Sequence, residues 1–296
     1  MAGRHHFPII FALLVVVSAV CGCQNSRIHR RLVLADSIMR SGNLDSVYSL
    51  LNRMDTARQL SEADRIYYQL IETQLRYRMR QPIEDTAAIS ECVAYYAGVQ
   101  KDARKLAQAY YYRGMLEMES GKTDEAVTSL KKAEEAAQRL HDLDLKHKIY
   151  DSLSTLNFLS DNIALARKYT ELALQCARIR GDGLWYAYAY NHLACIYEAL
   201  GQKDSAWIYV QKSLPYIKTV GQKDRAVFLY MIGENCHRNN ENRLAKHYLA
   251  LSCKAFPTSS AYNLLASISS IQFSRPTGTS GKLSPIRSLS TITTAA

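Results

Sequence analysis

The chain has 296 residues, 48% of them hydrophobic and 22% charged, with a formal net charge of +10. The net charge by itself would suggest a nucleic-acid-binding protein. The distribution of this charge along the chain argues against a nucleic-acid-binding protein. No Asp or Glu follows Glu241, and the six basic residues beyond that point carry most of the excess positive charge. The body of the chain is nearly balanced in charge, which excludes a broad basic surface.

The N-terminal segment has the pattern of an export signal. Residues Phe7–Val20 follow Arg4 and contain no charged side chain. An apolar run of this length matches the core of a signal peptide and is shorter than the roughly 20 residues that span a bilayer. Small residues and two cysteines, Cys21 and Cys23, come directly after it. We therefore predict a signal peptide over residues 1–22.

The end of this segment resembles the lipobox of bacterial lipoproteins, which has a small residue directly before the cysteine and an aliphatic residue three positions before it. Gly22 and Val20 meet these requirements for Cys23. Cys21 departs from the pattern, since Ala or Ser is usual there. The resemblance implies that Cys23 becomes a lipidated N-terminus, anchored in a membrane by its acyl chains and followed by a polar tether over residues 23–33. The alternatives are an ordinary secretory signal and an uncleaved anchor helix.

The residues beyond the tether show helical periodicity and an internal repeat. Gly and Pro are sparse, apolar residues recur at helical spacing and strand-like alternation is absent. Four segments align, each predicting a helix, a polar turn and a second helix: 110–133, 150–173, 190–213 and 229–252. One alanine recurs in all four at intervals of 40, 40 and 39 residues, as Ala126, Ala166, Ala206 and Ala245.

This pattern resembles the tetratricopeptide repeat (TPR), with longer units than the usual ~34 residues. The extra residues predict longer helices. The resemblance covers residues 34–257, including weaker hairpins at 34–54 and 62–98, and is closest to the long-repeat TPR lipoproteins found mainly in the Bacteroidota. It implies an all-α fold, an α-solenoid of stacked antiparallel helix hairpins in a right-handed superhelix. A generic α-solenoid is the alternative.

The resemblance also implies which residues pack between helices. Small side chains at repeat positions 8, 20 and 27 let two helices approach closely. The predicted packing residues are Gly114, Ala126, Ala133, Ala166, Ala173, Ala194, Ala206, Gly233 and Ala245. The match is partial, because position 11 is aromatic in the family and is Tyr here only at Tyr197.

The first helices of such repeats line a concave surface that suits an extended peptide or another protein's helix. Family positions 2, 5, 9, 12 and 13 usually face that surface. In this chain they form a set rich in aromatic residues and Met, which interfaces favour. The predicted partner-binding residues are Tyr111, Met115, Met118, Phe158, Tyr188, Asn191, Tyr230, His237 and Arg238. Alternatively, the lengthened helices bury many of these side chains against neighbouring repeats.

The sequence contains no recognisable catalytic or metal-binding motif. HExxH, GxSxG and a phosphate-binding glycine loop are absent. The cysteines beyond the signal have no metal-ligand spacing, which favours small buried helix residues and leaves their disulfide state open. They are Cys92, Cys176, Cys195, Cys236 and Cys253. We therefore expect no enzymatic activity, no cofactor and no metal.

These features together predict a membrane-anchored, exported TPR protein that acts as a protein–protein interaction scaffold or as the sensing half of a regulator. Its expected partners are another protein or peptide in the concave groove and a membrane at the N-terminal lipid, without nucleic acid. Its expected location is the cell envelope, on the periplasmic or outer-membrane side. The alternative is a glycan-binding surface lipoprotein that uses exposed aromatic residues such as Tyr188 and Trp185.

The C-terminal segment differs from the repeats. Residues 258–273 read as a first helix without a second one, and the Ser/Thr-rich residues 274–296 predict a disordered tail. A solenoid usually ends in a polar capping helix. The missing partner helix favours a C-terminus that is truncated or altered in frame.

Overall fold

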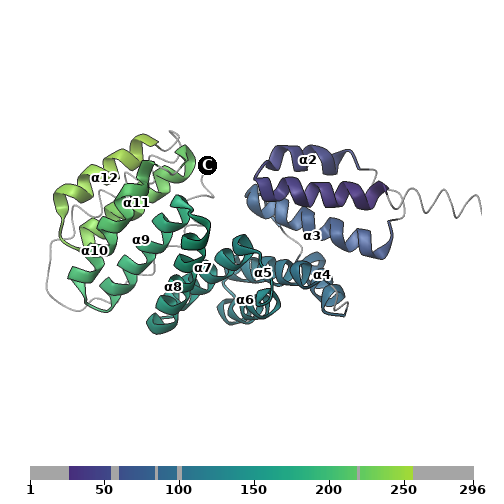
Figure 1. The fold of residues 1–296 in the computed structure, drawn as a ribbon, viewed down its shortest axis with the longest axis horizontal. Helices are drawn as coiled ribbons and strands as arrows, with labels where there is room; N and C mark the ends of the chain where they lie inside the picture. Colours follow the sequence, from purple (N-terminus) through teal and green to yellow (C-terminus); the bar gives the residue numbers. More distant parts are fainter. Residues whose placement is uncertain (1–26, 55–59, 84–85, 99–101, 219–220, 256–296) are drawn as a thin grey trace, which may run out of the picture. The chain divides into compact units, whose positions relative to one another are not determined.

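The computed structural model describes residues 27–54, 60–83, 86–98, 102–218 and 221–255 (Figure 1). All regular elements in these residues are helices, which confirms the predicted all-α fold. The predicted signal peptide at 1–22, Cys23, the helix at 258–273 and the tail at 274–296 lie outside the described residues. The predictions made for them stay predictions.

The helices follow one another with short connections. In chain order they are an N-terminal helix (residues 27–41), α2 (Leu44–Asn52), α3 (Glu62–Arg78), α4 (Ala87–Gly98), α5 (Ala103–Glu119), α6 (Thr123–Ala137), α7 (Leu143–Leu159), α8 (Ile163–Arg180), α9 (Gly183–Ala199), α10 (Lys203–Ser213), the 3-10 helix η1 (Leu214–Lys218), α11 (Gln222–Arg238) and α12 (Asn242–Ala255). The chain divides into two compact units, one ending at Glu117 and one beginning at Met118.

The first unit has a core built from the N-terminal helix, α2 and α3. Leu32 and Met39 of the N-terminal helix are buried together with Leu51 of α2 and Ile71 of α3. The prediction of a polar tether over residues 23–33 is therefore wrong for residues 27–33, which are helical. The reason is that Leu32 lies one or two turns before Ala35 and Met39 on the same apolar stripe of the helix. Because the burial of Leu32 requires helical backbone there, the neighbouring arginines are helical as well.

The second unit consists of helix hairpins. Helix α7 packs on α8, α9 on α10, and α11 on α12, while α9 also contacts both α8 and α11 (Figure 1). Helices α7, α9 and α11 each have 17 residues. An ordinary TPR unit of roughly 34 residues must hold two helices and their turns, so its helices are shorter. The predicted lengthening is confirmed for these first helices.

One turn position recurs inside the hairpins with a left-handed backbone. Gly121, Asp161, Gly201 and Asn240 have φ values of 73°, 58°, 72° and 62°. They are separated by the same 40, 40 and 39 residues as the recurring alanine. Glycine, asparagine and aspartate tolerate this conformation best, because other side chains clash with the backbone there. The polar turns of the repeat thus reverse the chain by one shared geometry.

Small residues allow close contact within the hairpins. A Cβ atom placed on Gly233 of α11 would lie 2.6 Å from Leu249 Cγ and 3.2 Å from Leu249 N of α12. In the hairpin of α7 and α8, two hairpins earlier, Ser154 takes the equivalent place, and its hydroxyl lies 2.6 Å from that of Thr170. The nine predicted packing residues are all buried.

Helix α10 is shorter than its counterparts. It has 11 residues and passes directly into η1, which starts with Leu214 and contains Pro215. Proline has no backbone N–H and its ring clashes with the preceding turn of an α-helix. The α-helical hydrogen bonding therefore ends at Ser213, and the chain continues as a tighter helix.

Candidate functional site

The first helices of the second unit are joined by side-chain contacts between residues about one repeat apart. Between α7 and α9, the rings of His147 and Trp185 stack with centroids 4.0 Å apart and planes inclined by 10°. Nearby, His192 Nδ1 lies 3.5 Å from a carboxylate oxygen of Asp151. His147 is buried, and this burial lowers its pKa below the ordinary value.

The contact between α9 and α11 is a buried amide pair. Asn235 Nδ2 donates to Asn191 Oδ1 at 3.1 Å, and Asn191 Nδ2 donates to the carbonyl of Ala187 at 2.9 Å. The thiol of Cys195 donates to Asn235 Oδ1 at 3.2 Å. Both asparagines are fully enclosed. Their hydrogen bonds satisfy polar groups that would otherwise be costly to bury.

One turn further along the same two helices, a cluster of charges lies closer to solvent. Arg238 Nη1 is 3.5 Å from Glu198 and Arg238 Nη2 is 3.8 Å from Glu234. Each of the three side chains is about one-fifth exposed. Partial burial raises the pKa of both carboxyl groups, and the nearby guanidinium offsets only part of that rise.

We call this set the inter-repeat row. Its residues are His147, Asp151, Trp185, Asn191, His192, Cys195, Glu198, Glu234, Asn235 and Arg238. Its buried half holds neighbouring repeats together. Its partly exposed half presents two carboxylates around the Arg238 guanidinium, with Lys203 acting on Glu198 and His237 on Glu234, and carboxylate oxygens there can accept further hydrogen bonds.

The row lacks the features of a catalytic or metal centre. Burial raises the pKa of the Cys195 thiol, so the side chain is a poor nucleophile. In the described part of the chain, no group of three or more His, Cys, Asp or Glu side chains is arranged to hold a metal ion. Among the described helices, none combines the length and the apolar character needed to cross a bilayer.

The predicted partner-binding residues fall into two classes. Tyr111, Met115 and Asn191 are buried, whereas the other six are partly exposed. Asn191 and Arg238 belong to the inter-repeat row. Burial raises the pKa of Tyr230 to about 12. The assignment of these nine residues to a partner surface remains a prediction.

Sequence reasoning missed several members of the row. Cys195 and Glu198 occupy family positions 9 and 12, so the repeat register alone could have included them. Their contacts Asn235 and Arg238 each lie 40 residues further along the chain. A search for polar residues separated by one repeat length would have found both pairs.

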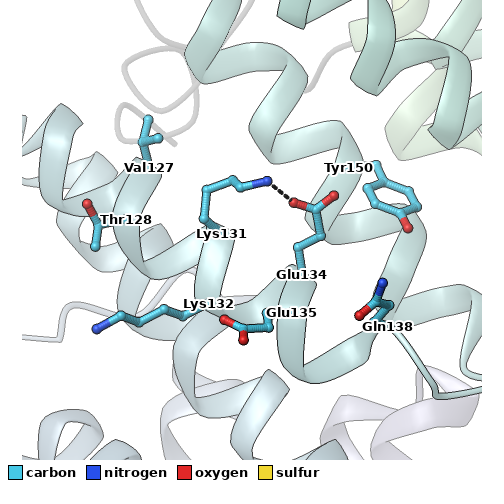
Figure 2. Close-up of a pocket in the computed structure, with 8 residues that line it drawn as sticks. All are labelled: Val127, Thr128, Lys131, Lys132, Glu134, Glu135, Gln138 and Tyr150. Atoms are coloured by element: carbon cyan, nitrogen blue, oxygen red, sulfur yellow. Dashed lines mark hydrogen bonds and ion pairs between the residues drawn. The ribbon is translucent and has the colours of Figure 1, made fainter.

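A second surface of this unit is a hollow of about 700 Å³ formed by α6 and Tyr150 of α7 (Figure 2). Lys131 points toward Glu134 and pairs with it, and the Lys131 ammonium also donates to the hydroxyl of Tyr169 at 2.8 Å. That hydroxyl donates to Glu134 at 3.1 Å. The central charges of the hollow are thus paired with one another, and the inter-repeat row is the stronger candidate site.

All five cysteines of the described residues are free thiols. Cys92, Cys176 and Cys236 are buried, and Cys195 and Cys253 are partly exposed. The burial of Cys92, Cys176 and Cys236 in helices agrees with the interpretation as small packing residues rather than ligands.

Comparison with known proteins gave matches in structure alone. Neither the scan of protein-family models nor the search of curated proteins returned a match to this sequence. The structure is similar to that of a Rap protein complexed with competence and sporulation factor, with a TM-score of 0.67, 14% identity, and coverage of 83% of this chain and 71% of that one. It is similar to NprR in complex with its cognate peptide NprX, with a TM-score of 0.57, 18% identity, and coverage of 83% and 72%.

A third similar structure is BtubC from P. vanneervenii, with a TM-score of 0.52 and 14% identity, covering 88% of this chain and 96% of that one. At such identities the likeness concerns the fold. Together with the helix hairpins and their 40-residue spacing, it shows that the chain has an all-α, TPR-like solenoid fold.

Proposed function

We propose that the chain is an exported, membrane-anchored protein that binds another protein or a peptide through the inter-repeat row. It would act as a scaffold or as the sensing part of a regulator, without catalysing a reaction. The observation that carries the proposal is the exposed end of the row, where Glu198 and Glu234 face one guanidinium, that of Arg238.

This cluster favours a ligand with a basic group. Two carboxylates share the Arg238 guanidinium, so a basic ligand group can form a charge-assisted hydrogen bond to a carboxylate oxygen there, in competition with Lys203 at Glu198. Partial burial strengthens such an interaction relative to the same pair in water. The row follows three successive first helices, α7, α9 and α11, which suits an extended chain more than a compact small molecule.

The known complexes support a peptide ligand by analogy. NprR, which shares this fold, was solved with its cognate peptide NprX, and the Rap protein was solved with competence and sporulation factor. The analogy concerns the fold and does not identify the ligand of this chain.

The membrane anchor rests on the sequence. The apolar run before Cys23, with Gly22 and Val20 at the required positions, supports lipidation of that cysteine. Acyl chains there would hold the protein at the cell envelope, on the periplasmic or outer-membrane side.

A peptide array tests the binding proposal. The full chain is applied to immobilised peptides of equal length that differ in their content of Lys and Arg. We expect saturable binding to a subset of basic peptides. The double substitution Glu198→Gln and Glu234→Gln should weaken that binding by about tenfold or more, since two charge-assisted contacts become neutral.

The matched control replaces two exposed carboxylates of α6, Glu125→Gln and Glu135→Gln, and changes the net charge equally. Equal losses in both variants would mean that the peptides respond only to total charge. Unchanged binding in the Glu198/Glu234 variant would place the partner elsewhere.

A further inference from the structure

The N-terminal helix has an outward face of unusual composition. Leu32, Ala35 and Met39 point into the core of the first unit. The opposite side carries Val33 and Leu34, which are 47% and 51% exposed. Two consecutive exposed aliphatic side chains of this size are not explained by packing within the described residues.

Arginines flank these aliphatic residues on the same face. Arg27 and Arg30 precede Val33 and Leu34 by one to two helical turns, and Arg40 follows, all three exposed. Steps of three, four and seven residues place side chains on one side of a helix. The outward face is therefore both cationic and apolar.

The N-terminal helix itself contributes little negative charge to this face. The sole carboxylate within residues 27–41 is Asp36, which is buried and accepts a hydrogen bond from Arg104 Nη1 at 2.8 Å. Asp36 also lies 4.0 Å from Arg40. Asp36 is thus shared between Arg104 and Arg40, and it is one carboxylate against four arginines within residues 27–41, so this helix carries an excess of positive charge.

We propose that this face of the N-terminal helix, centred on Val33 and Leu34 between Arg27 and Arg40, lies on an anionic lipid surface. The inference rests on the proposed anchor, since Arg27 is only four residues after Cys23. Four residues span at most about 14 Å when extended, so a lipid on Cys23 keeps the helix within reach of the headgroups.

The chemistry of the face matches that occupant. Arginines attract anionic headgroups electrostatically, and aliphatic side chains can enter the boundary with the acyl chains. A lipid anchor and a cationic patch together hold a protein more firmly than either alone. The helix would then fix the orientation of the first unit at the membrane.

Fluorescence quenching tests this contact in the full chain. Leu34→Trp is reconstituted in vesicles of equal parts phosphatidylglycerol and phosphatidylcholine whose acyl chains carry bromine. The parent chain gives the background from its own two tryptophans. We expect strong additional quenching for Leu34→Trp and for the second variant Val33→Trp, which guards against one variant folding poorly.

The control is Leu200→Trp in the second unit, where the native side chain is 44% exposed. It should show no additional quenching. Arg27→Glu with Arg40→Glu, placed in the Leu34→Trp chain made unlipidated by Cys23→Ser, should weaken binding to the same vesicles by about tenfold or more. The control pair Lys122→Glu with Arg139→Glu changes the charge equally on exposed residues of the second unit and should have a much smaller effect.

The outcomes separate this inference from the anchor. Mass spectrometry of the N-terminal peptide reports whether Cys23 is lipidated. A lipidated chain in which neither introduced tryptophan is quenched overturns the contact and leaves the anchor in place. A chain without lipid overturns the anchor, and the quenching then decides the contact by itself. Protection of both tryptophans from aqueous iodide in the absence of vesicles would mean that another protein surface covers the face, which also overturns the inference.

Discussion

The side-chain amide of Asn235 donates to the side-chain carbonyl of Asn191 across the interface between α9 and α11, at 3.1 Å. Both groups are fully enclosed, and each has a further partner. The pair is the most buried polar contact of the inter-repeat row. Its directionality fixes one register between two helices whose apolar surfaces could otherwise slide, as buried polar pairs do in coiled coils.

A double-mutant cycle measures this contact. Asn235→Leu should destabilise the second unit by about 1–3 kcal/mol, because Asn191 Oδ1 and the Cys195 thiol lose their partner in a buried place. Adding Asn191→Leu should cost less than the sum of the two single changes. Urea unfolding followed by tryptophan fluorescence isolates this unit, since both tryptophans, Trp185 and Trp207, belong to it. Strict additivity would contradict the coupling.

Acidification should destabilise the second unit through His147. Its pKa is lowered by burial, although Asp144, Asp151 and Asp182 oppose the shift and His192 adds to it. The unfolded chain therefore binds a proton at a higher pH than the folded one, and stability is lost as the pH falls below about 6.5. His147→Phe keeps an aromatic ring beside Trp185 and should remove this part of the pH dependence.

The measurement is the free energy of unfolding of both chains at several pH values between about 7.5 and 5. The difference between parent and variant should grow in favour of the variant as the pH falls. A constant difference would show that His147 titrates alike in the folded and unfolded states.

Gly233→Ala tests the close approach of α11 and α12. The added methyl would lie 2.6 Å from Leu249 Cγ and 3.2 Å from the Leu249 backbone nitrogen, so the helices must separate. We expect a net destabilisation of about 1–2 kcal/mol, after the gain of up to ~1 kcal/mol that alanine brings within a helix. Gly98→Ala, in helix α4 with open space around its Cβ position, should be neutral or stabilising by up to ~1 kcal/mol. If Gly233→Ala left the free energy of unfolding unchanged, helices α11 and α12 would accommodate the added methyl group without strain.

Thiol reactivity should follow burial. Cys92 and Cys236 are fully buried, and burial raises the pKa of each thiol to about 12. Against an ordinary value of 9.0, the thiolate fraction at neutral pH falls by a factor of roughly 1000. Among the five cysteines that the structure describes, iodoacetamide should modify the partly exposed Cys253 first in the native chain, as peptide mass mapping would show. Rapid modification of Cys236 before unfolding would contradict the packing of α11.

The repeat predicted much of the fold because it is a local property of the chain. Spacing of the recurring alanine located the hairpins, and the sequence register placed Gly121 and Gly201 in turns. The start of the N-terminal helix was missed because its arginines look like a solvated linker unless the buried Leu32 is weighed with Ala35 and Met39. The early end of α10 follows from Pro215, a single residue that the repeat pattern overlooks.

The candidate site could be predicted only in part. Family positions supplied Asn191 and Arg238, but their partners depend on how far one first helix is shifted against the next. That shift is a property of packing between repeats, which residue types alone do not encode. Tyr111 and Met115 illustrate the same limit, since their positions predicted a binding surface and their side chains are buried.

The partly exposed carboxylates of the row come from two different hairpins, because the row spans α9 and α11. They lie close together only while these two hairpins pack against each other. Glu198 belongs to one hairpin, and Glu234 with Arg238 to the next. Opening the hairpin of α11 and α12 would separate them. A ligand that requires both carboxylates would bind only the closed arrangement and would raise the free energy of opening by mass action. Ligand binding to the row and opening of the α11–α12 hairpin would then be coupled, so that each could be measured through the other.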